Sequence, residues 1–123
     1  RNAFYAMKVI FFNQMYDIIE KSFPADYETI RSVVVEDPRI GNSHSFVFHK
    51  VYRGYGGPCL PKDMNSLIAY ARKVGTPSEL LEKVKEINTK LVDGKDTRLG
   101  KYGIYSEPLG EKTEARGTPT HTS

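Results

Sequence analysis

The only cysteine of the chain, Cys59, lies in the segment RGYGGPCLPKD at residues 53–63. A thiol becomes a strong nucleophile when it ionises, and helix N-termini and nearby cations favour the thiolate. Glycines at 54, 56 and 57 precede this cysteine, and Lys62 and Asp63 follow it. Glycine permits backbone conformations and close ligand approach that a side chain would block. The segment therefore predicts an activated cysteine beside an anionic or carbonyl-bearing ligand.

An inert Cys59 is the competing hypothesis, because free cysteines often serve as small buried core residues. The residues alone leave both hypotheses open. Other chemical motifs fail: GYGGPC is no dinucleotide fingerprint, since Cys59 stands where its last glycine should be. His44 and His49 with Cys59 match no standard zinc spacing, so no metal site is predicted.

The first element that must position this segment is a helix predicted over residues 3–22. Aromatic residues widen its apolar stripe well beyond one face, and a helix that is apolar around most of its circumference is buried, often between subunits. We expect the chain to form a homodimer through this helix, so that its partner is a second copy of the chain. The stripe residues are Phe4, Met7, Ile10, Phe11, Met15, Ile18 and Ile19, widened by Tyr5, Val9, Phe12 and Tyr16.

Three shorter helices are predicted after it. The first covers residues 27–36 with Asp26 as its cap, although the β-branched residues at 33–35 also suit a strand. The next begins near Pro61 and ends at Gly75. TPSE at 76–79 reads as a capping box for the last, which stops at Gly94. The residues expected to face inward are Ile30, Val33 and Val34 in the first of these helices, Met64, Leu67, Ile68, Ala71 and Val74 in the next, and Leu80, Leu81, Val84, Ile87, Leu91 and Val92 in the last.

Between these helices, residues 36–45 are predicted to form a loop, and the weakly alternating residues 46–52 are expected to be extended. With 123 residues the chain should form one mainly α domain over residues 1–93, followed by an irregular or hairpin-like tail at 94–123. The net charge of +3 comes from interspersed acids and bases, which argues against nucleic-acid binding. No run of about 18 apolar residues predicts a membrane span. A single cysteine indicates a reducing, cytoplasmic compartment.

Four segments resemble the UDP-glucose dehydrogenases of the UDP-glucose/GDP-mannose dehydrogenase family. They are NAFYAMKVIFFNQM from residue 2, ADYETI from residue 25, DPRIG at 37–41 and GYGGPCLPKD at 54–63. The likeness runs in the family's order from residue 1 to about residue 92. It implies a helical central domain through which such enzymes form dimers.

The resemblance also implies an activity, the oxidation of UDP-glucose to UDP-glucuronate in two NAD-dependent hydride transfers. Cys59 would add to the intermediate aldehyde as a thiohemiacetal, which is oxidised to a thioester and hydrolysed. The implied roles are water handling for Asp63 and Asn2, cofactor contact for Lys62, and substrate binding for Gly54, Tyr55, Gly56 and, in a neighbouring subunit, Arg39.

The chain departs from the family pattern at both ends: residues 94–123 do not resemble the first strand of the second nucleotide-binding domain with which the family continues. The chain contains no N-terminal NAD-binding domain, and the family's catalytic lysine would precede Arg1. Because the chain lacks a starting methionine, we expect it to begin inside a larger protein. Residues 1–123 alone are therefore predicted to be inactive. The alternative is a non-catalytic helical dimerisation module from a split or degenerate dehydrogenase gene.

Overall fold

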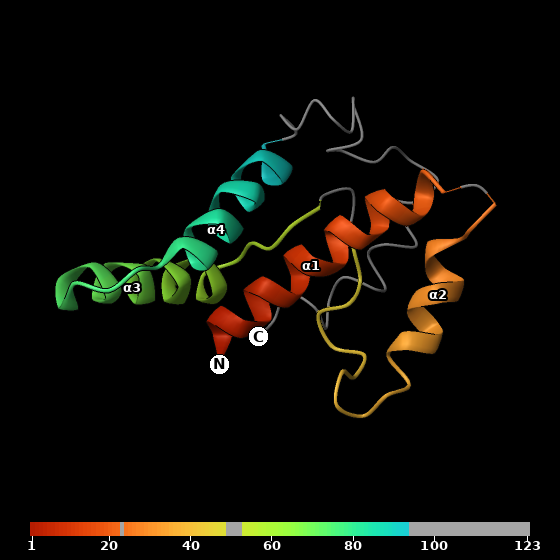
Figure 1. Cartoon of the computed structure of the whole chain (residues 1–123), viewed down its shortest axis with the longest axis horizontal. Helices are drawn as coiled ribbons and strands as arrows, with labels where there is room; N and C mark the ends of the chain where they lie inside the picture. The colour runs from red at the N-terminus through yellow and green to blue at the C-terminus, as the bar shows by residue number, and fades with distance from the viewer. Residues whose placement is uncertain (23, 49–52, 94–123) are drawn as a thin grey trace.

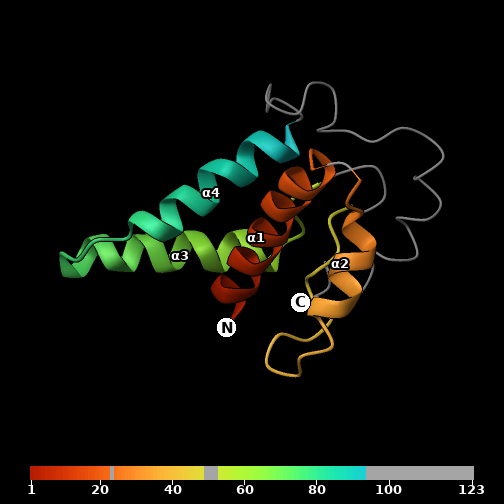
Figure 2. The ribbon, with the colours of Figure 1, turned by 45° about the vertical axis from the view of Figure 1, so that its right-hand side comes forward.

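The computed structural model describes residues 1–22, 24–48 and 53–93, and within these ranges the chain is mainly α, as predicted. The helices are α1 (Asn2–Glu20), α2 (Tyr27–Val34), α3 (Cys59–Val74) and α4 (Glu79–Val92). Helix α1 runs through the middle, with the α3–α4 hairpin on one side and α2 on the other (Figures 1 and 2). The predicted tail at 94–123 lies outside the described residues.

The larger core joins α1 to the α3–α4 hairpin. Its residues follow a helical period in each element, so each helix presents one apolar face to the other two. They are Ala6, Val9 and Ile10 of α1, Leu60, Met64 and Ile68 of α3, Val84 and Leu91 of α4, and Tyr55 from the preceding turn.

A second core lies on another face of α1. Phe12 and Ile19 pack there with Tyr27 of α2 and with Val47 and Phe48 of the following segment. The width of the apolar stripe on α1 thus has a direct explanation, because the helix contributes to two cores. A third part of the stripe stays uncovered: Phe4, Phe11 and Ile18 are each more than half exposed.

The predicted N-cap of α2, Asp26, is confirmed, but the predicted buried face of this helix is wrong. The backbone N–H of Thr29 donates to Asp26 Oδ2 at 3.0 Å. Ile30, Val33 and Val34 were expected to point inward and are instead exposed. The buried residues are Tyr27 and Arg31. Polar acceptors of the loop at 42–45 draw the buried face toward these two side chains, as the next contacts show.

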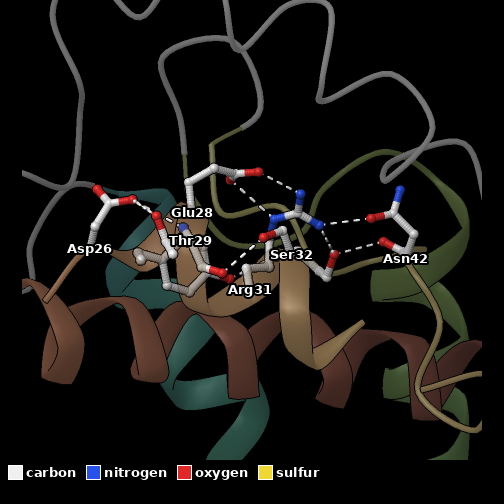
Figure 3. Close-up of polar contacts among 8 residues, drawn as sticks. Asp26, Glu28, Thr29, Arg31, Ser32 and Asn42 are labelled. Atoms are coloured by element: carbon white, nitrogen blue, oxygen red, sulfur yellow. Dashed lines mark hydrogen bonds and ion pairs between the residues drawn. The ribbon is translucent and has the colours of Figure 1, made fainter. Parts of the chain in front are cut away.

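Arg31 is held by acceptors from its own helix and from the loop that follows (Figure 3). Its guanidinium donates to both carboxylate oxygens of Glu28, to Asn42 Oδ1 at 2.7 Å and to Ser45 Oγ at 2.9 Å. The Tyr27 hydroxyl donates to the Ser45 carbonyl at 2.8 Å. These contacts fix residues 42–45 against α2, which hydrophobic periodicity could not predict.

Helix α3 begins at Cys59, slightly before the predicted Pro61, and Gly75 ends it in the left-handed conformation with φ of 77°. Leu67 and Val74, predicted to face inward, are exposed. Helix α4 was predicted to begin at Pro77, but its N-cap is Ser78.

The predicted capping box is thus wrong in register. The Ser78 hydroxyl donates to the Glu82 carboxylate, and no side chain caps the first backbone N–H groups. Leu80 and Val92, also predicted to be inward, are exposed. Residues 49–52 of the predicted extended segment lie outside the described residues, whereas Val47 and Phe48 are buried in irregular backbone. Among the described helices, none has the length and apolar content to cross a membrane.

Candidate active site

Cys59 is the first residue of α3 and is exposed, so the hypothesis of a buried core thiol is wrong. The first N–H groups of a helix have no partner within the helix, and the helix dipole places partial positive charge at this end. Both effects favour a negative charge on a side chain at this position. The structure thus places the thiol at the N-terminal end of α3, where it is accessible to a substrate.

Asp63 lies one helical turn after Cys59, so both side chains project from one face of α3. Asn2, at the start of α1, donates from its side-chain Nδ2 to Asp63 Oδ2 at 2.7 Å. The fold therefore joins two predicted site residues that are 61 positions apart in sequence. Among the described residues, Asp63 Oδ1 and Asn2 Oδ1 accept no side-chain hydrogen bond, which leaves both oxygens for a water molecule or a substrate hydroxyl.

Lys62 projects from the same first turn of α3 and is exposed. Within the described part of the chain its ammonium group forms no ion pair. An exposed cation at a helix N-terminus fits the phosphates of a dinucleotide, so the residue present is compatible with the predicted cofactor contact. The described residues offer no glycine fingerprint that would hold the rest of NAD.

The glycine turn before Cys59 is attached to α4. The Tyr55 backbone N–H donates to Asn88 Oδ1 at 2.6 Å, and Asn88 Nδ2 donates to the Tyr55 carbonyl at 3.0 Å. Gly54 has φ of 82°, and a Cβ there would lie 2.4 Å from Asn88 Oδ1. Gly54 therefore meets two requirements that favour glycine, a left-handed backbone and close approach of a neighbour.

Tyr55 and Gly56 were both predicted to bind substrate, and the structure places them differently. The Tyr55 ring is buried in the larger core, and burial raises the pKa of its hydroxyl to about 12. That phenol therefore stays protonated, and its ring is not available at the surface. Gly56 is partly exposed, and a Cβ there would meet no atom within 4 Å. The space beside Gly56 is open to a ligand.

Arg53, immediately before Gly54, is fully buried and attaches the turn to α1. Its Nε donates to Asn13 Oδ1 at 2.9 Å and its Nη2 donates to the Asn13 carbonyl at 2.8 Å. Its Nη1 forms an ion pair with Asp17 at 2.9 Å. Sequence reasoning missed Arg53, Asn13 and Asn88. The available signal was that Asn13 and Asn88 interrupt the apolar faces of their helices.

Arg39, which was predicted to bind the substrate of a neighbouring subunit, is not joined to the Cys59 cluster in the described residues. Its guanidinium pairs with Asp37 at 2.9 Å and is 89% exposed. The hydrogen bond between Asp37 and Arg39 favours the charged form of both groups. It therefore lowers the pKa of the Asp37 carboxyl and raises the pKa of the Arg39 guanidinium. Arg39 borders a groove on the surface formed by α1 and α4.

Comparison with known proteins adds to this geometry. The profile of the UDP-glucose/GDP-mannose dehydrogenase family, central domain, matches residues 1–90. The chain belongs to this family. It is 41% identical over 103 residues to UDP-glucose 6-dehydrogenase YwqF of Bacillus subtilis, covering 80% of this chain and 22% of that protein.

It is also 36% identical over 117 residues to UDP-glucose 6-dehydrogenase of Pseudomonas aeruginosa, covering 94% of this chain and 22% of that protein. The resemblance noted in the sequence is thereby confirmed. The chain spans about a fifth of the length of these relatives.

Proposed function

We propose that this chain is the cysteine-bearing central domain of an NAD-dependent dehydrogenase that oxidises UDP-glucose to UDP-glucuronate. The observation that carries the proposal is the exposed Cys59 at the N-terminus of α3, one turn from the hydrogen-bonded Asn2–Asp63 pair. An accessible nucleophile and a nearby carboxylate are the groups that aldehyde capture and thioester hydrolysis require. The names of the relatives support UDP-glucose as the substrate.

In the proposed reaction, the C6 alcohol of the sugar loses a hydride and a proton to become an aldehyde. The Cys59 thiol adds across the aldehyde C=O bond: the sulfur bonds to the carbon and the thiol proton passes to the oxygen, which gives a thiohemiacetal. Loss of a second hydride and a proton gives the thioester, and water then releases the carboxylate and the thiol. Asp63 accepts a proton from that water. Asn2 holds the Asp63 carboxylate in place through the 2.7 Å hydrogen bond.

NAD, when bound, supplies the acceptor for both hydrides. Lys62 is the residue of this chain that we assign to its phosphates, because its cation is exposed beside the nucleophile. The printed 123 residues contain no dinucleotide fingerprint. They should therefore give no steady formation of NADH from UDP-glucose and NAD by themselves. Steady turnover by the purified chain would contradict this part of the proposal.

The nucleophile can be tested without any cofactor. UDP-6-aldehydo-glucose labelled with ¹³C at C6 should form a thiohemiacetal with Cys59, visible as a new ¹³C resonance. Cys59→Ser should abolish that resonance, and Lys62→Met, which keeps the thiol, should retain it. If the unsubstituted, folded chain gives no adduct at millimolar aldehyde, Cys59 is not the proposed nucleophile.

We also propose that a second copy of the chain covers the exposed face of α1. Phe4, Phe11 and Ile18 recur every seven residues and form an apolar ridge. Phe4 and Phe11 of the ridge also line one side of a groove of about 460 Å³, together with side chains of α4 and of Val34, Arg39 and Ile40. A ridge and a groove on one face allow an isologous interface, in which each ridge enters the partner's groove. Arg39, on the rim of this groove, would then lie close to the partner's site.

Sedimentation equilibrium tests this contact. Phe11→Glu in the ridge should convert a dimer to a monomer, because it places a charge in an apolar interface. Tyr70→Glu is the matched control: Tyr70 on α3 is 60% exposed, against 57% for Phe11, and lies outside the groove. A monomeric unsubstituted chain at micromolar concentration, or equal effects of the two substitutions, would contradict the proposed interface.

The same groove supports the alternative function, a non-catalytic dimerisation module. The two functions differ in the thiol: a dimer that forms no aldehyde adduct at Cys59 would favour the module. The single cysteine remains the basis for expecting a reducing, cytoplasmic environment, where that thiol would stay free.

A further inference from the structure

Asn88 forms an unusually complete contact with one backbone residue of the glycine turn. Its amide oxygen accepts from the Tyr55 N–H at 2.6 Å, and its amide nitrogen donates to the Tyr55 carbonyl at 3.0 Å. Asn88 is only 9% exposed, and it comes from α4, 33 residues further along the chain. A buried amide of this kind satisfies both polar groups of a backbone residue that has no regular partner strand or helix.

The neighbouring Gly54 fits this contact sterically. Its φ of 82° and the 2.4 Å separation between a Cβ at this position and Asn88 Oδ1 mean that a larger residue would displace the amide. On the other side of the turn, Arg53 is attached to Asn13 and Asp17 of α1. Two adjacent parts of the turn are thus fixed to two different helices immediately before Cys59.

From these contacts we propose that Asn88 is a positioning residue for Cys59, acting through the Tyr55 backbone. Three residues separate Tyr55 from Cys59, namely Gly56, Gly57 and Pro58, and none of them carries a side-chain hydrogen-bonding group. The path of this short segment is therefore set largely by its anchored end and by α3. Asn88 itself touches neither the thiol nor, in the proposed function, the substrate.

The proposal rests on the proposed function only for the importance of Cys59, and its test needs no turnover. Asn88→Ala in the full chain should raise the amide exchange rate of Tyr55, followed by NMR. It should also slow the alkylation of Cys59 by iodoacetamide at neutral pH about two- to fivefold. The reason is that a loosened first turn no longer aligns its N–H groups beside the sulfur. Cys59 is the only thiol, so the alkylation rate reports on it alone.

Val84→Ala is the matched control. Val84 is a buried residue of the same helix and packs in the larger core, so its truncation lowers global stability without removing the Tyr55 contact. Its alkylation rate, corrected for the unfolded fraction, should equal that of the unsubstituted chain. Asn88→Asp, which keeps an acceptor for the Tyr55 N–H, should retain protection of that amide and shows whether the bond itself is responsible.

Equal corrected rates for Asn88→Ala and Val84→Ala would overturn the proposal, because Asn88 would then act through stability alone. Faster Tyr55 exchange with unchanged Cys59 alkylation would also overturn it, since the anchor would not reach the thiol. If Asn88→Ala slows alkylation but the unsubstituted chain forms no aldehyde adduct, the positioning role stands and the proposed function fails. The two proposals can therefore fail separately.

Discussion

Two buried arginines hold two different parts of this chain, and they do so over very different sequence distances. Arg31 bonds Glu28, Asn42 and Ser45, which lie 3 to 14 residues away. Arg53 bonds Asn13, 40 residues away, and pairs with Asp17. Arg31 therefore organises a local unit of α2 and its loop, whereas Arg53 joins the turn before Cys59 to the central helix.

The carboxylate partners differ as well. Glu28 is 48% exposed and Asp17 is 25% exposed. A charge pair that is shielded from water depends more strongly on each partner, because a lone charge left behind is poorly solvated. The two arginines, alike in type and burial, are therefore expected to differ in how much stability they contribute and in whether the candidate active site depends on them.

The largest expected effect is that of Arg53→Ala. Loss of the guanidinium removes its hydrogen bonds to Asn13 and its ion pair with Asp17, and should lower the free energy of unfolding by about 3 kcal/mol. Urea denaturation followed by circular dichroism measures this loss. Arg39→Ala, in an arginine that is 89% exposed, is the control and should change stability little. A loss for Arg53→Ala no larger than for Arg39→Ala would remove the basis of the comparison.

Gly54→Ala tests the same turn through its backbone and should cost about 2 kcal/mol, from the left-handed φ and the displaced Asn88. Gly75→Ala is its matched control: φ is 77° there, but a Cβ would meet no atom within 4 Å. The difference between the two losses of unfolding free energy measures the close approach of α4 to Gly54, in which Asn88 is the nearest side chain. Equal losses would mean that the close approach at Gly54 contributes nothing.

Arg31→Ala should cost less, about 1.5 kcal/mol, because it removes charged hydrogen bonds whose main acceptor is half exposed. The alkylation rate of Cys59, corrected for unfolding, should not change, since the polar and ring contacts of Arg31 within the described residues go to Glu28 and to residues 42–46. Urea denaturation and iodoacetamide labelling together check both statements. Slower alkylation in this variant would show that the two regions are coupled after all.

The smallest expected effect concerns His44, which lies between two of the loop residues that Arg31 binds. Burial, together with the charge of Lys8, lowers the pKa of His44 from its usual 6.5. In the window below about 6.5, the unfolded chain then binds a proton that the folded chain does not. The free energy of unfolding should therefore fall as the pH is lowered through this window.

His44→Asn removes that titration and tolerates the left-handed backbone, where His44 has φ of 62°. Urea denaturation at several pH values between about 5 and 7.5 should show a shallower pH dependence for this variant. If the free energy of unfolding depended on pH in the same way in His44→Asn and in the unsubstituted chain, a group other than His44 would be responsible for that dependence. An effect on Cys59 alkylation would again indicate coupling between the two regions.

Much of this fold could be predicted from local sequence signals. The long first helix, the Asp26 cap and the Gly75 stop depend on nearby residues and were correct. Predictions failed where the tertiary environment decided the outcome. Ile30, Val33 and Val34 looked like an inward face, but the loop at 42–45 offered polar acceptors to Arg31 and Tyr27 on another face.

For the candidate site, the sequence by itself determined the residue types and their order, including Cys59 with Lys62 and Asp63 one helical turn away. Helical spacing is enough to bring such neighbours to one face. Only the tertiary structure decided that Cys59 is exposed, that Asn2 reaches Asp63, and that Arg53 and Asn88 hold the turn between α1 and α4. The physical reason is that these contacts join residues 33 to 61 positions apart, and packing of the helices alone sets such distances.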